Sequence, residues 1–184
     1  MKEIRIHGRA GQGAITTARI LAMAAFADDI YALAFPRFGA ERMGAPMNAF
    51  VRLDNKKIKL RSQIYTPDYV IVIDPTLTRI KDFDVFEGLK SEGAAIVNYP
   101  EGKELEVDIE AKVWTLPATQ IALDVIGQDR ANTPLLGAFA AATGEISISA
   151  LERGIRQNFG EGSIADKNLE AVKRAYDYIM NQKA

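Results

Sequence analysis

The stretch EIRIHGRAGQGAITTARILAMAAF, residues 3–26, decides the fold class, because its pattern predicts a strand, a glycine-rich loop and a helix in succession. Ile4 and Ile6 alternate with charged residues, as expected of a strand that ends near Gly8. From Ala14 to Phe26, apolar residues recur with helical spacing, and the alanines among them allow close packing on a sheet. The stretch therefore predicts the first unit of an α/β fold.

Further apolar runs predict the rest of the sheet. The run at 69–73 is rich in β-branched residues and ends at Asp74, which suits a central strand covered on both faces. Other strand candidates lie at 30–34, 94–97 and 113–116. In the C-terminal third, Asn132 and Thr133 precede a proline that favours a helix start, and the apolar run that follows predicts a central helix.

One antiparallel hairpin is predicted at 49–60. Its alternating apolar residues at 49, 51 and 53 would face the same way as those at 58 and 60, across a turn at Asp54 and Asn55. We therefore expect residues 1–184 to form a single layered α/β domain with a largely parallel sheet, one antiparallel hairpin and helices on both faces.

Composition excludes several classes of function. The formal net charge is -1, so no global field attracts nucleic acid or an anionic membrane. The absence of cysteine excludes thiolate ligands for an iron–sulfur cluster, and a single histidine excludes a metal site with several histidines in one chain. No signal peptide and no bilayer-spanning apolar stretch is recognisable, so a cytoplasmic protein is expected.

The glycine loop has two interpretations. Gly8, Gly11 and Gly13 between a strand and a helix could present backbone N–H groups to an anion at the helix N-terminus. The spacing matches neither GxGxxG nor a P-loop, so a tight turn for close packing is the favoured interpretation. Arg9 and Gln12 are donors that a turn does not require, and they strengthen the anion or interface alternative.

The segment FPRFGAERMGAPM, residues 35–47, mixes glycine and proline with apolar and charged side chains. Its apolar residues favour burial and its charged residues need partners. The apolar ones are Phe35, Phe38, Met43 and Met47, and the charged ones are Arg37, Glu41 and Arg42. Such a loop is usually folded against something else, and another chain is one candidate.

Other candidate residues have ordinary structural explanations beside the functional ones. The basic residues at 56, 57, 59 and 61 favour a solvated strand edge over phosphate binding. His7 favours a structural role, because no carboxylate partner is close in sequence. Asp74 follows a strand, where α/β folds often place ligands, but a strand terminator is equally compatible. No nucleophile elbow of the GxSxG type is present. The chain is therefore expected to complete a site whose chemistry lies elsewhere.

Three motifs carry a family resemblance. HGRAGQGA (7–14), AFPRFGAERMGAP (34–46) and NTPLLGA (132–138), in this order, resemble the gamma subunits of the 2-oxoacid:ferredoxin oxidoreductases, in particular those of pyruvate:ferredoxin oxidoreductase. The resemblance extends over essentially the whole chain, including RSQIYTPDYVIVIDPTL at 61–77.

The resemblance implies a function for a complex, not for this chain alone. Such enzymes oxidatively decarboxylate a 2-oxoacid with coenzyme A to acyl-CoA and carbon dioxide, and pass two electrons to ferredoxin. Thiamine diphosphate and iron–sulfur clusters are implied on alpha, beta and delta partner chains, in agreement with the lack of cysteine here. The gamma chain is implied to support assembly and to lie near the coenzyme A route. Alone, it is expected to be inactive and prone to self-association through residues 35–47.

A shared site is the resulting hypothesis. The loops at 11–13, 37–42 and 132–133 would converge at one end of the sheet, dock the catalytic chains and help to hold coenzyme A. Interface packing is favoured over direct ligand contact for these loops. The cofactor-binding candidates are Gly11, Gln12, Gly13, Arg37, Glu41, Arg42, Asn132 and Thr133.

Two alternatives remain open. One is a free-standing nucleotide-binding α/β enzyme that uses the glycine loop and Asp74, which tight nucleotide binding by the isolated chain would support. The other is a regulatory binding module of the same fold in a different complex.

Overall fold

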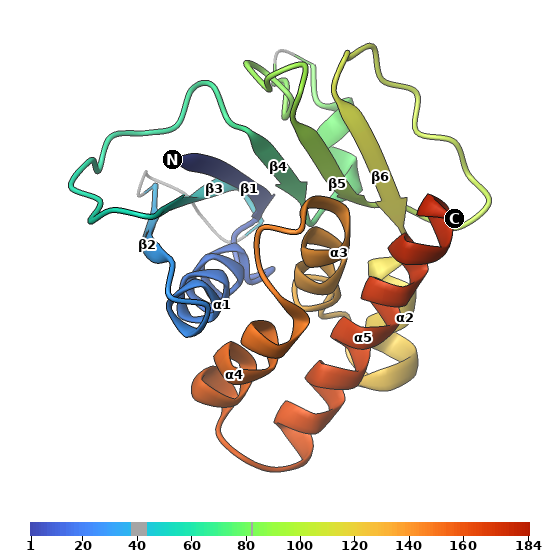
Figure 1. The fold of residues 1–184 in the computed structure, drawn as a ribbon. Coiled ribbons are helices and arrows are strands. Elements are labelled where there is room, and N and C mark those ends of the chain that lie inside the picture. The colour runs from blue at the N-terminus through green and yellow to red at the C-terminus, as the bar shows by residue number, and fades with distance from the viewer. Residues whose placement is uncertain (38–43, 82) are drawn as a thin grey trace.

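A six-stranded sheet forms the centre of the molecule (Figure 1). The computed structural model describes residues 1–37, 44–81 and 83–184. The strand order is β2-β3-β1-β4-β5-β6, in which β3 runs antiparallel to both its neighbours, whereas β1, β4, β5 and β6 pair in parallel. The strands are β1 (Lys2–Arg9), β2 (Tyr31–Pro36), β3 (Pro46–Asp54), β4 (Tyr69–Val72), β5 (Ala94–Asn98) and β6 (Lys112–Leu116).

The helices are distributed unequally over the two faces of the sheet. All five α-helices contribute to the hydrophobic cluster on one face, and Figure 1 shows them grouped below the strands. The 3-10 helix η1 (Pro75–Arg79) packs in the smaller cluster on the other face, so the prediction of helices on both faces is confirmed but unevenly. The α-helices are α1 (Ala14–Ala27), α2 (Ala118–Val125), α3 (Pro134–Thr143), α4 (Ile148–Phe159) and α5 (Ser163–Lys183).

The predicted α/β class and largely parallel sheet are confirmed, but the hairpin lies elsewhere. β3 pairs with β2 across the 37–45 segment and with β1 on its other side. The expected return strand at 58–60 is coil, so the prediction of a 49–60 hairpin is wrong. The physical reason is that Arg52 donates hydrogen bonds from its guanidinium to the backbone carbonyls of Leu60 (3.0 Å) and Ser62 (2.8 Å).

The helical face is closely packed and apolar. Ile4 and Ile6 of β1 and Ile71 of β4 are fully buried in the hydrophobic cluster to which the five α-helices contribute. In α3, the residues from Pro134 to Ala141 are all buried, which confirms the expected central helix. No helix in the described part of the chain is long and apolar enough to cross a membrane.

The opposite face buries polar side chains beneath irregular segments. The guanidinium of Arg5 donates hydrogen bonds to the carbonyls of Val85 (3.2 Å) and Glu87 (2.5 Å) and, through Nε, to His7 Nε2 (2.9 Å). The His7 ring also lies edge-on to Phe83, with a centroid distance of 5.9 Å. His7 is only 2% exposed, and burial followed by the charge of Arg5 lowers its pKa to about 3. These contacts support the structural interpretation of His7.

Gly137 is expected to be a sensitive packing position. A Cβ at Gly137 would lie 2.0 Å from the Val172 carbonyl oxygen, whereas at Gly154 the nearest atoms, Ala24 N and Ile20 O, are 3.0 Å away. Gly137→Ala should therefore lower the free energy of unfolding by about 2–3 kcal/mol through overpacking between α3 and α5. Gly154→Ala, the matched helical control, should change it by less than about 1 kcal/mol. Equal effects in urea unfolding would contradict the close approach.

Replacing His7 with Gln is expected to weaken the acid dependence of stability. The unfolded chain binds a proton at His7 below about pH 6.5, but the folded chain does so only near pH 3, so stability falls as the pH falls through that window. Because one pKa unit corresponds to about 1.4 kcal/mol, the wild type should lose about 3 kcal/mol more than the variant between about pH 6.5 and 4. Parallel unfolding curves across this range would exclude a buried neutral histidine.

Candidate functional site

The candidate site lies at the edge of the sheet where the parallel strands end. The glycine loop follows β1, Asp74 follows β4, and Asn98 is the last residue of β5. Carboxyl ends of parallel strands are the usual ligand position in α/β folds. The glycine loop is therefore placed where the sequence predicts a binding edge.

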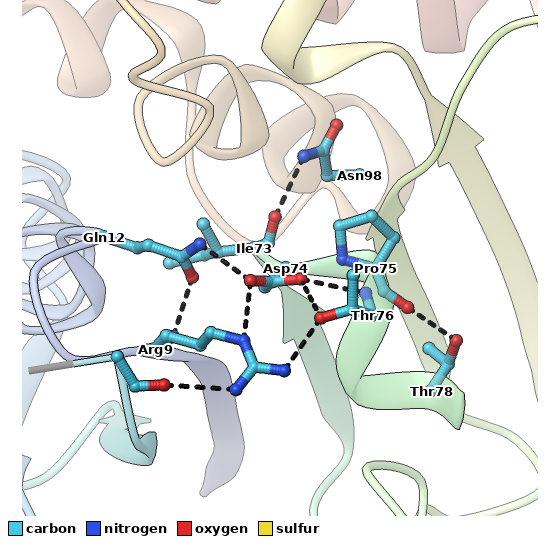
Figure 2. A network of polar contacts seen from close by, with 9 residues as sticks. Arg9, Gln12, Ile73, Asp74, Pro75, Thr76, Thr78 and Asn98 are labelled. Carbon is cyan, nitrogen blue, oxygen red and sulfur yellow. Dashed lines mark hydrogen bonds and ion pairs between the residues drawn. The ribbon is translucent and has the colours of Figure 1, made fainter. Parts of the chain in front are cut away.

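A polar network centred on Asp74 organises this edge (Figure 2). The Asp74 carboxylate accepts hydrogen bonds from Arg9 Nε (3.1 Å), Gln12 Nε2 (2.8 Å) and both the backbone N–H (2.9 Å) and hydroxyl (2.6 Å) of Thr76. Burial raises the pKa of Asp74, but the hydrogen bonds from Thr76 and Gln12 and the charge of Arg9 outweigh burial and leave it lowered. Asp74 is thus an ionised brace that joins β1, β4 and η1.

Gln12 is occupied within this network. Its side-chain oxygen accepts a hydrogen bond from the backbone N–H of Arg9 (2.7 Å), while its side-chain nitrogen donates to Asp74. Both ends of the amide therefore hold the loop in shape. The cofactor-binding role expected for Gln12 stays a prediction, and the observed contacts are structural.

The described end of the 37–45 segment docks against the glycine loop. Arg9 Nη1 donates to the Gly44 carbonyl (3.1 Å), and the Ala10 N–H donates to the Ala45 carbonyl (2.9 Å). Arg37 is exposed at the end of β2, and its backbone N–H donates to the Asn48 carbonyl (3.0 Å). The candidates Glu41 and Arg42, with the apolar Phe38 and Met43, lie outside the described residues.

Asn132 and Thr133 meet the glycine loop at the start of α3. Gly13 has a φ of 85°, and a Cβ built there would lie 2.8 Å from Asn132 Nδ2, so the two segments touch. Asn132 is 5% exposed and Thr133 1% exposed, and neither side chain forms a hydrogen bond with another residue that the structure describes. Both line a cavity of about 570 Å³ beside Gly13. The loops at residues 11–13 and 132–133 are therefore in contact, as predicted.

Sequence reasoning missed several residues of this edge. A second hollow of about 230 Å³ is lined by Asp74, Asn98 and Thr119, among others. Asn98 Nδ2 donates to the Ile73 carbonyl (2.9 Å) and to the Thr119 hydroxyl (2.9 Å), which ties β5 to β4 and α2. The position of Asn98 at the end of an apolar run could have indicated a site residue. No feature of the sequence around Thr119 indicated one. Arg130 and Lys167, exposed residues that line the larger cavity, also had no local signal.

The arrangement offers the groups of a ligand-binding site. It offers amide, hydroxyl and cationic donors around a cavity, which suits an anionic or amide-bearing ligand. Within residues 1–37, 44–81 and 83–184, no three His, Asp or Glu side chains are grouped so that they could hold a metal ion. The donors that line the cavity can hold and position a ligand.

Known proteins resemble this chain over nearly its full length. The family model described as pyruvate ferredoxin/flavodoxin oxidoreductase matches residues 3–178. A pyruvate synthase subunit PorC of Methanosarcina barkeri is 54% identical over 157 residues, which are 85% of each chain. A pyruvate/ketoisovalerate oxidoreductases common subunit gamma of Pyrococcus furiosus is 46% identical over 96% of each chain.

A solved structure shares the fold. The crystal structure of a pyruvate oxidoreductase subunit from Thermotoga maritima matches with a TM-score of 0.82 and 37% identity, and the match covers 96% of this chain and 95% of that one.

Asp74→Asn is expected to destabilise the carboxyl edge. An amide cannot accept all the hydrogen bonds that the carboxylate accepts, so the free energy of unfolding should fall by about 1–3 kcal/mol. The difference should disappear at acid pH, because the lowered pKa of Asp74 makes its contribution present near neutrality and lost as the carboxylate is protonated. Asp124→Asn, whose carboxylate accepts an exposed hydrogen bond from Gln120, serves as the control in urea unfolding. Equal losses would contradict the bracing role.

Proposed function

Because the chain belongs to the pyruvate ferredoxin/flavodoxin oxidoreductase family, we propose that it is the gamma subunit of a 2-oxoacid:ferredoxin oxidoreductase, with pyruvate as the substrate of the complex. The complex would convert the 2-oxoacid and coenzyme A to acyl-CoA and carbon dioxide and pass electrons to ferredoxin. The free-standing nucleotide enzyme is not favoured, because full-length relatives are named as subunits of oxidoreductases.

The observation that carries the proposal is the carboxyl edge itself. It combines a braced glycine loop with two buried polar side chains, Asn132 and Thr133, that line a cavity without described hydrogen-bond partners. Donors and acceptors that are held in place but not used by the residues that the structure describes suit a ligand or a companion chain.

The division of labour follows from composition. A chain without cysteine cannot supply thiolates to iron–sulfur clusters, so these clusters belong on companion chains. Thiamine diphosphate is likewise assigned to those companions, which would be alpha, beta and delta chains. Ferredoxin would be the electron acceptor of the complex, which we place in the cytoplasm.

Coenzyme A fits the donors of this edge. Bound there, coenzyme A would supply the thiol that accepts the acyl group. The backbone N–H groups near Gly11 and Gly13 and the side chains of Asn132 and Thr133 would hold its polar parts. The exposed Lys167 lines the same cavity as Asn132 and would offer a cation to a phosphate.

In this proposal, the 37–45 segment contacts a companion chain more than it binds a ligand. Gly44 and Ala45 accept hydrogen bonds from Arg9, at the end of β1, and from Ala10 of the glycine loop, so this end of the segment lies against the loop. Arg37 is exposed at the border of this surface, where a companion chain could pair with it. The ligand roles of Glu41 and Arg42 stay predictions.

Variants at Asn132 test the ligand role in the assembled complex. Asn132→Asp places a negative charge in the cavity and should raise the KM for coenzyme A about tenfold, equivalent to about 1.4 kcal/mol, with a smaller effect on kcat. Thr133→Val, which keeps shape but loses the hydroxyl, should raise the KM in the same direction. Asn181→Asp, on the exposed last turn of α5, is the matched control.

Two results would contradict the proposal at different levels. An unchanged KM for coenzyme A in a fully assembled Asn132→Asp complex would remove the ligand role. Full ferredoxin-reducing activity in a complex that lacks this chain would remove the subunit function.

A further inference from the structure

A basic segment, residues 55–65, connects β3 to β4 and is not used by the candidate site. It contains four cations, Lys56, Lys57, Lys59 and Arg61, and no acidic residue. The formal net charge of the whole chain is -1, so the rest of the chain is acidic and this patch is a local feature. Figure 1 shows the connection as a long loop outside the sheet.

The explanation of this patch as a guarded strand edge does not apply. Residues 57–61 carry the alternating pattern of a strand but are coil in the structure. All four cations are exposed, and none forms an ion pair with another described residue. Leu60 is 49% exposed and Tyr65 is 72% exposed among them. The patch therefore combines positive charge that no described residue neutralises with exposed apolar surface.

Two buried arginines fix the backbone of the basic segment. Arg52 is 1% exposed and donates to the carbonyls of Leu60 (3.0 Å) and Ser62 (2.8 Å), while its Nε contacts Glu3 at 2.7 Å. Arg5 donates to the Ile64 carbonyl at 3.5 Å. Burial of a guanidinium is unfavourable unless it is fully paired. The segment is thus held against the sheet with its lysines directed outward, which lowers the entropy lost on docking.

We propose that the basic segment docks onto an acidic surface of a companion protein chain, with Leu60 and Tyr65 in the apolar centre of the contact. The identity of the companion as a chain of the same oxidoreductase complex rests on the proposed function. The segment starts where β3 ends, beside the first residues of β1 and β2. It therefore begins at the amino edge of the parallel strands, opposite the candidate site, and forms a second, independent contact.

A protein partner fits the patch better than a polyanion. Protein interfaces combine an apolar centre with a charged rim, as Leu60 and Tyr65 among the cations do. Electrostatic complementarity mainly adds specificity and speed of association.

Carboxyl–amine cross-linking of the intact complex tests the contact directly. A zero-length carbodiimide reagent should join Lys56, Lys57 or Lys59 to Asp or Glu residues of one companion chain, identified by mass spectrometry. Lys103, exposed in the connection between β5 and β6, and Lys173, exposed on α5, are the internal controls and should give no cross-links to that surface. Cross-links from the control lysines but none from the basic segment would overturn the proposal.

Charge reversal measures the contribution of the patch. The full-length chain is co-expressed with tagged companion chains, and the retained fraction is followed over a salt series. Lys57→Glu with Lys59→Glu should weaken association about tenfold at low salt and less at high salt, because screening removes the attraction. Lys103→Glu with Lys173→Glu is the matched control with the same change in charge. Leu60→Ser should weaken association at all salt concentrations.

The outcomes separate this proposal from the proposed function. A wild-type chain that fails to associate with the companions would overturn both. A wild-type chain that associates as well as the charge-reversed variant would overturn the docking proposal alone. Binding to heparin, or to vesicles of phosphatidylcholine and phosphatidylserine, that is lost on charge reversal while association is unchanged would assign the patch to a polyanion and overturn the protein partner.

Discussion

The carboxylate of Asp74 is the group on which the arrangement of the carboxyl edge depends. It is 8% exposed, and a buried charge is tolerated because donors surround it. Arg9 reaches it from the end of β1, Gln12 from the loop that follows, and Thr76 from η1. Through Arg9 the same network extends to Gly44. One side chain thereby keeps three distant segments in register, and the glycine loop beside the cavity takes its shape from that register.

The two faces of the sheet have different physical characters. The face that carries α1 to α5 is apolar and supplies most of the hydrophobic burial. The other face buries Arg5, His7 and Arg52, and the two arginines donate hydrogen bonds to the backbone carbonyls of irregular segments. Buried arginine is a poor source of stability but a precise way to fix a loop. The face with the buried arginines therefore holds surface loops in place, in particular the basic segment. The helical face stabilises the fold.

Sequence patterns predicted the helices and strands whose formation depends on hydrophobic periodicity and on residues at helix starts. The alternation at Ile4 and Ile6, the run at 69–73 and the apolar helix after Pro134 each appear where expected. The hairpin was misplaced because alternation at 57–61 cannot say which strand becomes the neighbour of β3, and Arg52 captures those carbonyls instead. The contact between Gly13 and Asn132 was predictable, because both residues lie at the starts of predicted helices. Thr119 was not predictable, because only the packing of α2 on β5 brings it to the site.

The central claim is that the braced carboxyl edge becomes buried against companion chains and coenzyme A. Hydrogen exchange of the backbone amides, in the isolated chain and in the assembled complex with coenzyme A, tests it most directly. The account predicts strongly slowed exchange at residues 9–14, 44–48 and 131–134 on assembly, beyond any general stabilisation of the sheet. Unchanged exchange at these residues in a complex that contains the chain would contradict the account.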